Sequence, residues 1–260
     1  MNFRRILALQ CKQLYLTRRS FDRLGDLIIW PILDLLLWGF VTLYVGDMTE
    51  APVQAFIIGG LILWIFIWRA NNDISLFVLE DFWSRNLYNL FSSPMTIGEL
   101  LLSLTLGGFF RILCTFAITA AVAFALYHFS ILSLGVVMLL LSGSVLMLFG
   151  WAVGIAISSL FFRFGDRIHL FSWGSTFLLL PFSCVLYPLA ALPPWAQPIA
   201  KLLPTTQVFE SMRAVLSGQP VPWLPFGIAL LESLIFLIIA VWLFGLGIKR
   251  AKQTGLLTKY

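Results

Sequence analysis

Charged residues are scarce in this chain of 260 residues, because only 11% are Asp, Glu, Lys or Arg whereas 60% are hydrophobic. Soluble domains carry about 25% charged residues. The composition therefore excludes an ordinary soluble protein and indicates a polytopic membrane protein. The net charge of +5 does not point to nucleic acid, because most of the basic residues lie at the edges of apolar runs, where membrane topology accounts for them.

Patterns for catalysis, nucleotide binding and metal binding are also missing. The predicted topology places the two histidines, His128 and His169, at opposite faces of the membrane, and neither a His-Glu-x-x-His nor a Gly-x-Ser-x-Gly sequence occurs. No glycine is followed by lysine, so the chain has no Walker A loop. The three cysteines show no paired or metal-like spacing. We therefore expect neither an enzyme nor a bound metal or cofactor in this chain. If the protein works against a gradient, its energy comes from elsewhere.

Long apolar runs dominate what is present, and they predict an all-α integral membrane protein with six transmembrane helices. The predicted spans are 27–45, 53–68, 97–127, 131–162, 168–187 and 226–248. Residues 1–25 mix basic side chains with an apolar stripe, which predicts an N-terminal amphipathic helix lying in the membrane interface. A flexible basic tail is the alternative for this segment. We thus divide the chain into an interfacial helix, 1–25, and a transmembrane domain, 26–260.

The distribution of Lys and Arg predicts the orientation of these spans. Fourteen of the 17 basic residues fall in the N-terminal segment, in residues 69–94, in residues 163–167 and in the C-terminal tail, whereas only Lys201 and Arg213 fall on the other side. Because cytoplasmic loops carry the excess of Lys and Arg, both termini are predicted to be cytoplasmic. The segment that follows the fifth predicted span is then on the outer side.

That outer segment is interrupted by prolines. Each proline removes a backbone donor and fixes φ, so no single spanning helix can run through it: the prolines are Pro188, Pro193, Pro194, Pro198 and Pro204. Two short helices fit instead, the second capped by Thr205 or Thr206 and closed by Gly218. We expect a re-entrant hairpin over residues 193–217, with a proline-rich loop on the surface as the alternative.

A second informative segment lies on the predicted cytosolic side. Apolar residues recur at helical spacing between residues 79 and 94, which predicts a short amphipathic helix that ends before Pro94. Such a helix can lie on lipid or dock into a groove of a soluble partner, and its periodicity does not distinguish the two. The residues selected for a partner contact are Glu80, Phe82, Trp83, Arg85, Leu87 and Leu90.

Three ionisable residues fall inside predicted spans: Asp34, Arg111 and Glu232. Because charges are costly in lipid, these side chains should face protein or a cavity. Asp34 and Arg111 could form an ion pair between the first and third spans, and we favour this structural role over a transport site. The alternative is that these residues line a path, for which the selected residues are Asp34, Trp38, Arg111 and Glu232. A ridge of small residues predicts close helix packing within one subunit: Gly150, Gly154 and Ser158.

Taken together, these features resemble the membrane-spanning permease subunits of ABC exporters of the ABC-2 type. Residues 90–99 (LFSSPMTIGE) look like the coupling-helix region of that family, and residues 192–213 (LPPWAQPIAKLLPTTQVFESMR), followed by Gly218, look like its outer re-entrant hairpin. Glu210 and Arg213 match its Glu-x-x-Arg position and could pair on one helix face. The order and spacing of these segments carry the resemblance over essentially the whole chain.

The resemblance implies a multi-pass permease of the cell (inner) membrane. A separate ATP-binding subunit, which would hold ATP and Mg, would dock against residues 80–93. A second copy, or alternatively a homologue, would complete a path formed largely by the first, second and fifth spans, and no nucleic acid would be involved. An outer gate would include Pro193, Pro204, Glu210 and Arg213.

The substrate implied in this way is a hydrophobic or amphipathic molecule, such as a drug or lipid. A polysaccharide or glycolipid exporter is the alternative within the family. From another class, a gradient-driven carrier or channel would use the three intramembrane charges and need no ATPase, although the chain lacks the inverted halves with matching broken helices of such carriers.

Overall fold

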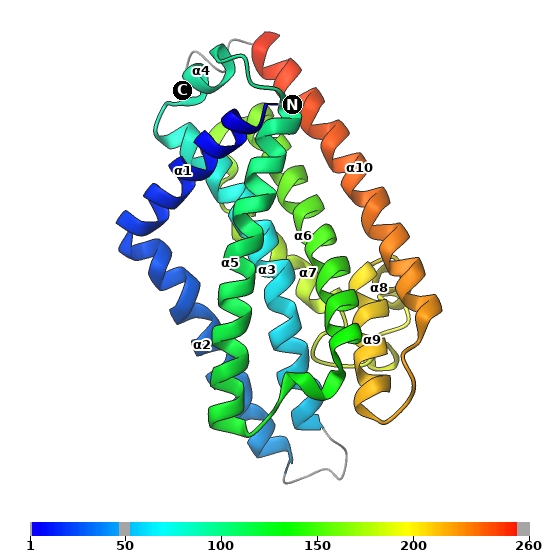
Figure 1. Ribbon diagram of the computed structural model, residues 1–260. Helices are drawn as coiled ribbons and strands as arrows, with labels where there is room; N and C mark the ends of the chain where they lie inside the picture. Colours follow the sequence, from blue (N-terminus) through cyan, green and yellow to red (C-terminus); the bar gives the residue numbers. More distant parts are fainter. Residues whose placement is uncertain (1, 47–52, 254–260) are drawn as a thin grey trace.

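The computed structural model describes residues 2–46 and 53–253, and within these ranges the chain forms helices and no strand. Five long helices build an elongated bundle (Figure 1): α2 (Phe21–Gly46), α3 (Val53–Trp83), α5 (Ile97–Tyr127), α6 (Val136–Phe164) and α10 (Trp223–Gln253). The shorter α-helices are α1 (Phe3–Arg19), α4 (Leu87–Ser92), α7 (Phe171–Leu179), α8 (Gln197–Lys201) and α9 (Pro204–Leu216). The described ranges also contain four 3-10 turns: η1 (Ile131–Leu134), η2 (Gly165–Ile168), η3 (Leu180–Phe182) and η4 (Leu189–Ala191).

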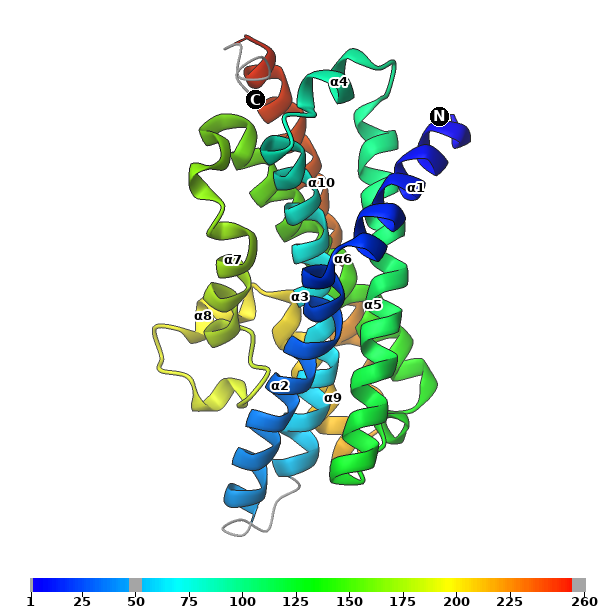
Figure 2. The same cartoon turned by 90° about the vertical axis from the view of Figure 1, so that its left-hand side faces the viewer.

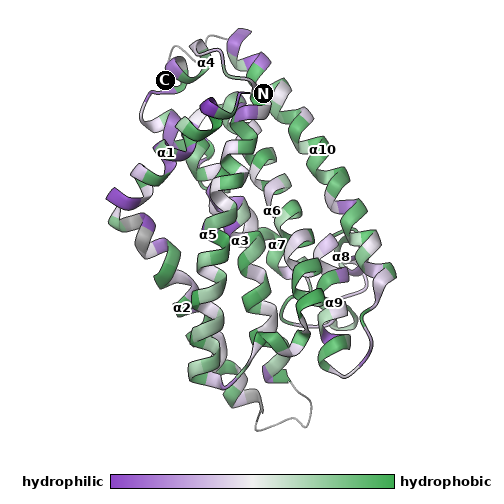
Figure 3. Ribbon diagram, in the orientation of Figure 1, coloured by the Kyte–Doolittle hydropathy of each residue, from purple (hydrophilic) through white to green (hydrophobic). Residues whose placement is uncertain are grey.

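The bundle has two distinct ends. At one end, which we call the α4 end, α1 begins, α4 lies and α10 finishes (Figures 1 and 2). At the opposite end, the hairpin end, η1 joins α5 to α6, and α8 and α9 occupy this half of the bundle. Figure 3 shows polar residues gathered around the α4 end and apolar residues along the long helices, as expected when the bundle walls face lipid.

Helix α3 forms the centre of the bundle. It contacts α2, α5, α6, α7 and α9, and nearly all of its side chains from Ile58 to Phe82 are buried. A helix that is apolar all round is stable only in an interior, which explains why α3 lies inside while α2 and α10 keep long exposed apolar faces. The central helix therefore positions every other element of the fold.

Within the described residues, five helices are long and apolar enough to cross a membrane, so the all-α prediction is confirmed but the sixth predicted span is not. In the predicted span 168–187, helix α7 has nine residues, or about 13.5 Å at 1.5 Å per residue. The hydrocarbon core is about 30 Å thick. The helix ends at Leu179 and is followed by η3, which contains Pro181, a residue that lacks the backbone donor needed to continue an α-helix.

The helix of the second predicted span, 53–68, is longer than that span, because α3 continues to Trp83. Residues 69–82 were expected in a cytosolic segment, yet they form buried helix. The polar side chains that suggested a boundary, Arg69 and Asp73, are paired inside the bundle. Their mutual neutralisation allows the helix to continue among apolar neighbours.

Pro31 lies inside α2 without ending the helix. A proline cannot donate to the carbonyl four residues earlier, which here belongs to Leu27. The Thr115 hydroxyl of α5 donates to the Leu27 carbonyl at 3.4 Å. Neighbouring helices can satisfy backbone groups freed by proline in a membrane helix, and this contact also fixes α2 against α5.

The small-residue ridge on α6 packs against α3, which confirms the prediction of helix packing within one subunit. A Cβ atom on Gly154 would lie 2.8 Å from the Asn71 carbonyl oxygen, and one on Gly150 would lie 2.7 Å from the Ala70 Cβ. Only glycine permits this approach, because both added atoms would overlap neighbours that belong to or adjoin the α3 backbone.

We predict that Gly154→Ala destabilises the protein by about 1–3 kcal/mol, the usual cost of overpacking a tight contact. Replacing glycine by alanine inside a helix normally stabilises a protein by about 1 kcal/mol, so the destabilisation expected here is opposite in sign to the usual effect. The matched control is Gly245→Ala on α10, where an added Cβ would have no neighbour within 4 Å. Heating each variant in mild detergent and measuring the monodisperse fraction by size exclusion checks the prediction. Equal stability of the two variants would contradict the packing.

Candidate functional site

A cleft lies between α2, α3 and α7. Its larger part has a volume of about 450 Å³ and is lined by Asp26, Trp30, Trp68, Asn72, Leu76, Trp173 and Phe177. A smaller part of about 120 Å³ shares three of these residues and adds Pro31, Asp34, Leu35, Leu61, Trp64, Ile65 and Thr119. From Leu61 to Leu76 the lining follows α3 for about 22 Å at 1.5 Å per residue. The two parts form one aromatic cleft along the central helix.

Hydrogen bonds hold the α7 wall of this cleft against α3. The Asn71 side-chain amide donates to the Ser172 carbonyl at 2.8 Å and to the Thr176 hydroxyl at 2.8 Å. Trp68 and Phe177 make an edge contact with 5.2 Å between ring centroids. Because α7 is short and ends in irregular backbone, these contacts from α3 supply partners that the helix itself does not.

An ion network adjoins the cleft at Asp26, which is one of its lining residues. Buried Arg69 pairs with Asp26 of α2 and with Asp73, the latter at 2.8 Å. Asp73 also accepts a hydrogen bond from Nε of Arg111 at 2.9 Å. The guanidinium of Arg111 lies 4.5 Å from the Phe77 ring centroid. The network thus joins α2, α3 and α5 through charge pairs and a cation–π contact.

The expected Asp34–Arg111 pair is wrong, because Arg111 pairs with Asp73. Asp34 instead lines the cleft. Trp38 is half-buried on α2 and is not among the residues that line the cleft. Glu232 lies on α10, which packs against α6 and α9, so the structure does not bring it to the cleft. Of the residues selected for a path, only Asp34 lies there.

Sequence reasoning missed Asp26, Asp73 and the aromatic wall of Trp173 and Phe177. One signal was available: Arg69 and Asp73 are four residues apart and are followed by further apolar residues, the pattern of a self-neutralised pair in a continuing helix. No local signal relates Asp26 or α7 to this pair, because those contacts cross the bundle.

The predicted amphipathic helix near the α4 end is divided into two parts. Helix α3 ends at Trp83, and six-residue α4 begins at Leu87, with Arg85 between them at a φ of 53°. The prediction that the helical segment ends before Pro94 is confirmed, because α4 ends at Ser92. A residue in the left-handed region interrupts helical hydrogen bonding, so the continuous helix was not formed.

Burial separates the six residues selected there for a partner contact. Phe82, Leu87 and Leu90 are buried in the apolar core, and this burial corrects their assignment to a docking surface. Glu80 pairs with Arg23 of α2. Trp83 has 55% of its surface exposed, and Arg85 is exposed beside it. Among the described side chains of residues 80–90, the exposed ones are therefore residues 83–85 and Asn89.

Helix α1 is attached to this region by polar contacts. Lys12 pairs with Asp81 near the end of α3, and Arg5 lies 3.5 Å from Glu99 in the first turn of α5. Glu99 also forms a capping box with Thr96, which fixes the start of that helix. Movement at the α4 end would therefore be transmitted to both α1 and α5.

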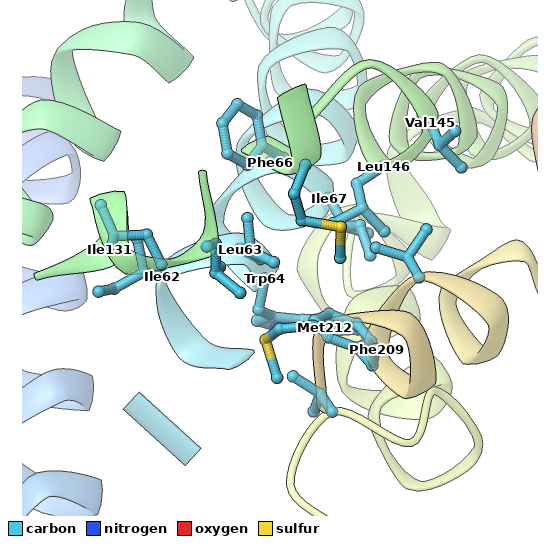
Figure 4. Close-up of a cluster of buried hydrophobic side chains, with 14 of the residues drawn as sticks. Ile62, Leu63, Trp64, Phe66, Ile67, Ile131, Val145, Leu146, Phe209 and Met212 are labelled. Atoms are coloured by element: carbon cyan, nitrogen blue, oxygen red, sulfur yellow. The ribbon is translucent and has the colours of Figure 1, made fainter. Parts of the chain in front are cut away.

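The proline-broken segment packs into the bundle at the hairpin end. Two helices form as predicted, although α8 has only five residues. Figure 4 shows Phe209 and Met212 of α9 beside Trp64 of α3, and the rings of Trp64 and Phe209 are 6.4 Å apart. The buried face of α9 accounts for its helix, because an amphipathic segment is stabilised by packing of its apolar side.

The predicted threonine caps of α9 are wrong, whereas Gly218 does close it. Pro204 occupies the first turn, where its missing N–H costs little, and the Thr206 hydroxyl donates to the Ala200 carbonyl instead. Gly218 has a φ of 84° and its N–H donates to the Val215 carbonyl. Such a left-handed glycine is the usual helix terminator.

Glu210 and Arg213 of α9 form the predicted pair at 2.9 Å. The pair also fixes the loop before η4: Arg213 donates to the Cys184 carbonyl at 2.8 Å, and Glu210 accepts from the Leu189 N–H at 2.7 Å. Cys184 is fully buried. Pro193 lies between η4 and α8, so the four residues selected for an outer gate fall in one compact unit.

Comparison with known families identifies the chain. A family model described as ABC-2 type transporter matches residues 8–217, a range that includes the cleft, the α4 region and the hairpin. A search of curated protein sequences found no match. The matched range covers most of the 260 residues. The chain therefore belongs to the ABC-2 type transporter family and is a multi-pass membrane permease of an ABC transporter.

Proposed function

We propose that this permease forms the membrane path of an ATP-driven exporter and moves a hydrophobic or amphipathic molecule out of the cytoplasm or the inner leaflet. The observation that carries the proposal is the aromatic cleft between α2, α3 and α7. These three elements correspond to the spans that the family resemblance assigns to the path. A second copy would cover the exposed apolar residues of α2, such as Leu33 and Leu37, and enclose the cleft in a homodimer.

The charge distribution supports an orientation with the α4 end in the cytosol of the cell (inner) membrane. The start of α1, with Arg4 and Arg5, and the basic last turn of α10 lie at this end, which agrees with the excess of Lys and Arg found in cytoplasmic segments. The exposed apolar residues of α1, including Phe3 and Leu14, would then lie in the membrane interface. The hairpin of α8 and α9 would form an outer, re-entrant gate.

A separate ATP-binding subunit, carrying ATP and Mg, would dock at the α4 end. Exposed aromatic residues are enriched in protein interfaces, and Trp83 is such a residue beside α4. The buried residues Phe82 and Leu87 would connect the docked subunit to α6 and α10, because they pack in the same core cluster as Phe162 and Phe244. ATP-driven movement of the partner would thus reach the long helices as a rigid-body displacement.

We expect the double substitution Trp83→Asp/Asn89→Asp to reduce the amount of ATP-binding subunit that co-purifies by on the order of tenfold, as for loss of an interface anchor. Both side chains are exposed, so the permease should remain folded and monodisperse. The control is Trp223→Asp, because Trp223 has 65% of its surface exposed at the hairpin end. Unchanged co-purification in the double variant would contradict docking at this surface.

A further inference from the structure

Asp34 is the unbalanced charge of the cleft. The other carboxylate in the lining, Asp26, pairs with Arg69, whereas Asp34 makes no hydrogen bond or ion pair with any residue in the ranges that the structure describes. No Lys, Arg or His is among the lining residues of either part of the cleft. The Thr119 hydroxyl, also in the lining, already donates to the Thr115 carbonyl at 2.9 Å. Asp34 therefore lacks the internal partner that an intramembrane carboxylate requires.

Aromatic rings surround the space beside Asp34. Trp30, Trp64, Trp68 and Phe177 line the same part of the cleft, and Trp173 lines the adjoining part. Indole is the best aromatic partner for a cation, and rings arranged around a site favour quaternary ammonium-like groups. The same rings provide an apolar surface for the rest of a ligand. Carboxylate and rings together match one ligand chemistry, a positive charge embedded in apolar groups.

We propose that the cleft binds hydrophobic cations, with Asp34 as the counter-charge and the tryptophans as the aromatic surface. The inference rests on the proposed function, of which it specifies the substrate class. Binding of the cation would neutralise Asp34, so the ligand would supply the partner that the carboxylate lacks among the described residues. Neutral and anionic molecules of the same shape would lack this contribution.

The test compares two ions of the same size and shape. Radiolabelled tetraphenylphosphonium and tetraphenylborate are bound to the purified full-length permease in mild detergent, without ATP, and excess unlabelled ion defines non-specific uptake. We expect the cation to bind at least about tenfold more tightly than the anion. Asp34→Asn should weaken binding of the cation by about tenfold, the effect of losing one charge-assisted contact. The control is Glu232→Gln, which alters a carboxylate on α10 and should change the affinity for neither ion.

A second pair of variants tests the aromatic surface without altering charge. Trp30→Leu should weaken binding of the cation several-fold, because Trp30 lines both parts of the cleft. Trp242→Leu should not, since Trp242 lies on α10 with 62% of its surface exposed, against 63% for Trp30. Equal affinity for both ions, or unchanged cation binding in Asp34→Asn, would overturn the proposal. Because no partner or ATP is involved, these results are independent of whether an ATP-binding subunit exists.

Discussion

Asp73→Asn is expected to destabilise the protein by about 3–5 kcal/mol, the usual cost of removing one member of a buried ion group. Asp73 balances both Arg69 and Arg111, and its side chain is 6% exposed. Its loss leaves Arg111 without the carboxylate that neutralises it and reduces the partners of Arg69 to Asp26. We expect the variant to lose most of its monodisperse fraction on mild heating in detergent.

A double-mutant cycle separates this charge effect from simple loss of packing. Adding Arg111→Gln to Asp73→Asn should cost less than the sum of the single changes, because the second substitution removes the uncompensated charge. Glu80→Gln on the same helix is the control: its partner is Arg23, both side chains are partly exposed, and such pairs contribute about 1 kcal/mol or less. Additive effects in the cycle would contradict a coupled buried network.

Arg213→Met is expected to open the loop that precedes the hairpin and to expose Cys184. The Arg213 guanidinium donates hydrogen bonds to the Cys184 carbonyl and to the Glu210 carboxylate, and Glu210 accepts a hydrogen bond from the Leu189 N–H. Leaving these buried groups unpaired costs about 1–3 kcal/mol. Burial of Cys184 limits access to its thiol, and it also raises the thiol pKa. Less thiolate is then present at a given pH, so opening should increase reactivity through both effects.

The measurement is the rate of maleimide labelling at Cys184, in a background where the exposed Cys11 and Cys114 are replaced by serine and alanine. We expect Arg213→Met to accelerate labelling by about tenfold or more, the factor that corresponds to about 1.4 kcal/mol of lost protection. Lys201→Met is the control, because Lys201 is exposed on α8 within the same hairpin. Equal rates in the two variants would show that Arg213 does not fasten the loop.

Features encoded by local sequence were predictable. Apolar runs located the five long helices, prolines located the break between α8 and α9, and the i,i+3 spacing of Glu210 and Arg213 predicted their pair. Each of these depends on interactions within a few residues, for which periodicity and proline geometry are sufficient. The small-residue ridge on α6 also predicted its close packing, because small residues at helical spacing allow two helix backbones to approach closely.

Features that depend on distant partners were not predictable. The helix was expected to end near Trp68 because a charged residue, Arg69, follows it. The ion pairs of Arg69 with Asp26 and Asp73, which allow the helix to continue, cannot be recognised from the local sequence. Arg111 was assigned to Asp34 because both lie in apolar runs, whereas the fold brings Asp73 to it. Phe82 and Leu87 were expected on a surface, since helical spacing identifies an apolar face but not what covers it. The aromatic cleft required three elements from separate parts of the sequence.

The most direct test of an ATP-driven permease is to purify the protein from its native membranes in mild detergent, identify the proteins that accompany it and assay ATP hydrolysis. The chain itself contains no Walker A sequence. We expect a stoichiometric soluble subunit that carries this sequence and hydrolyses ATP. Recovery of the permease alone, without ATPase activity and with transport that follows an ion gradient, would contradict the proposed function and favour a gradient-driven carrier.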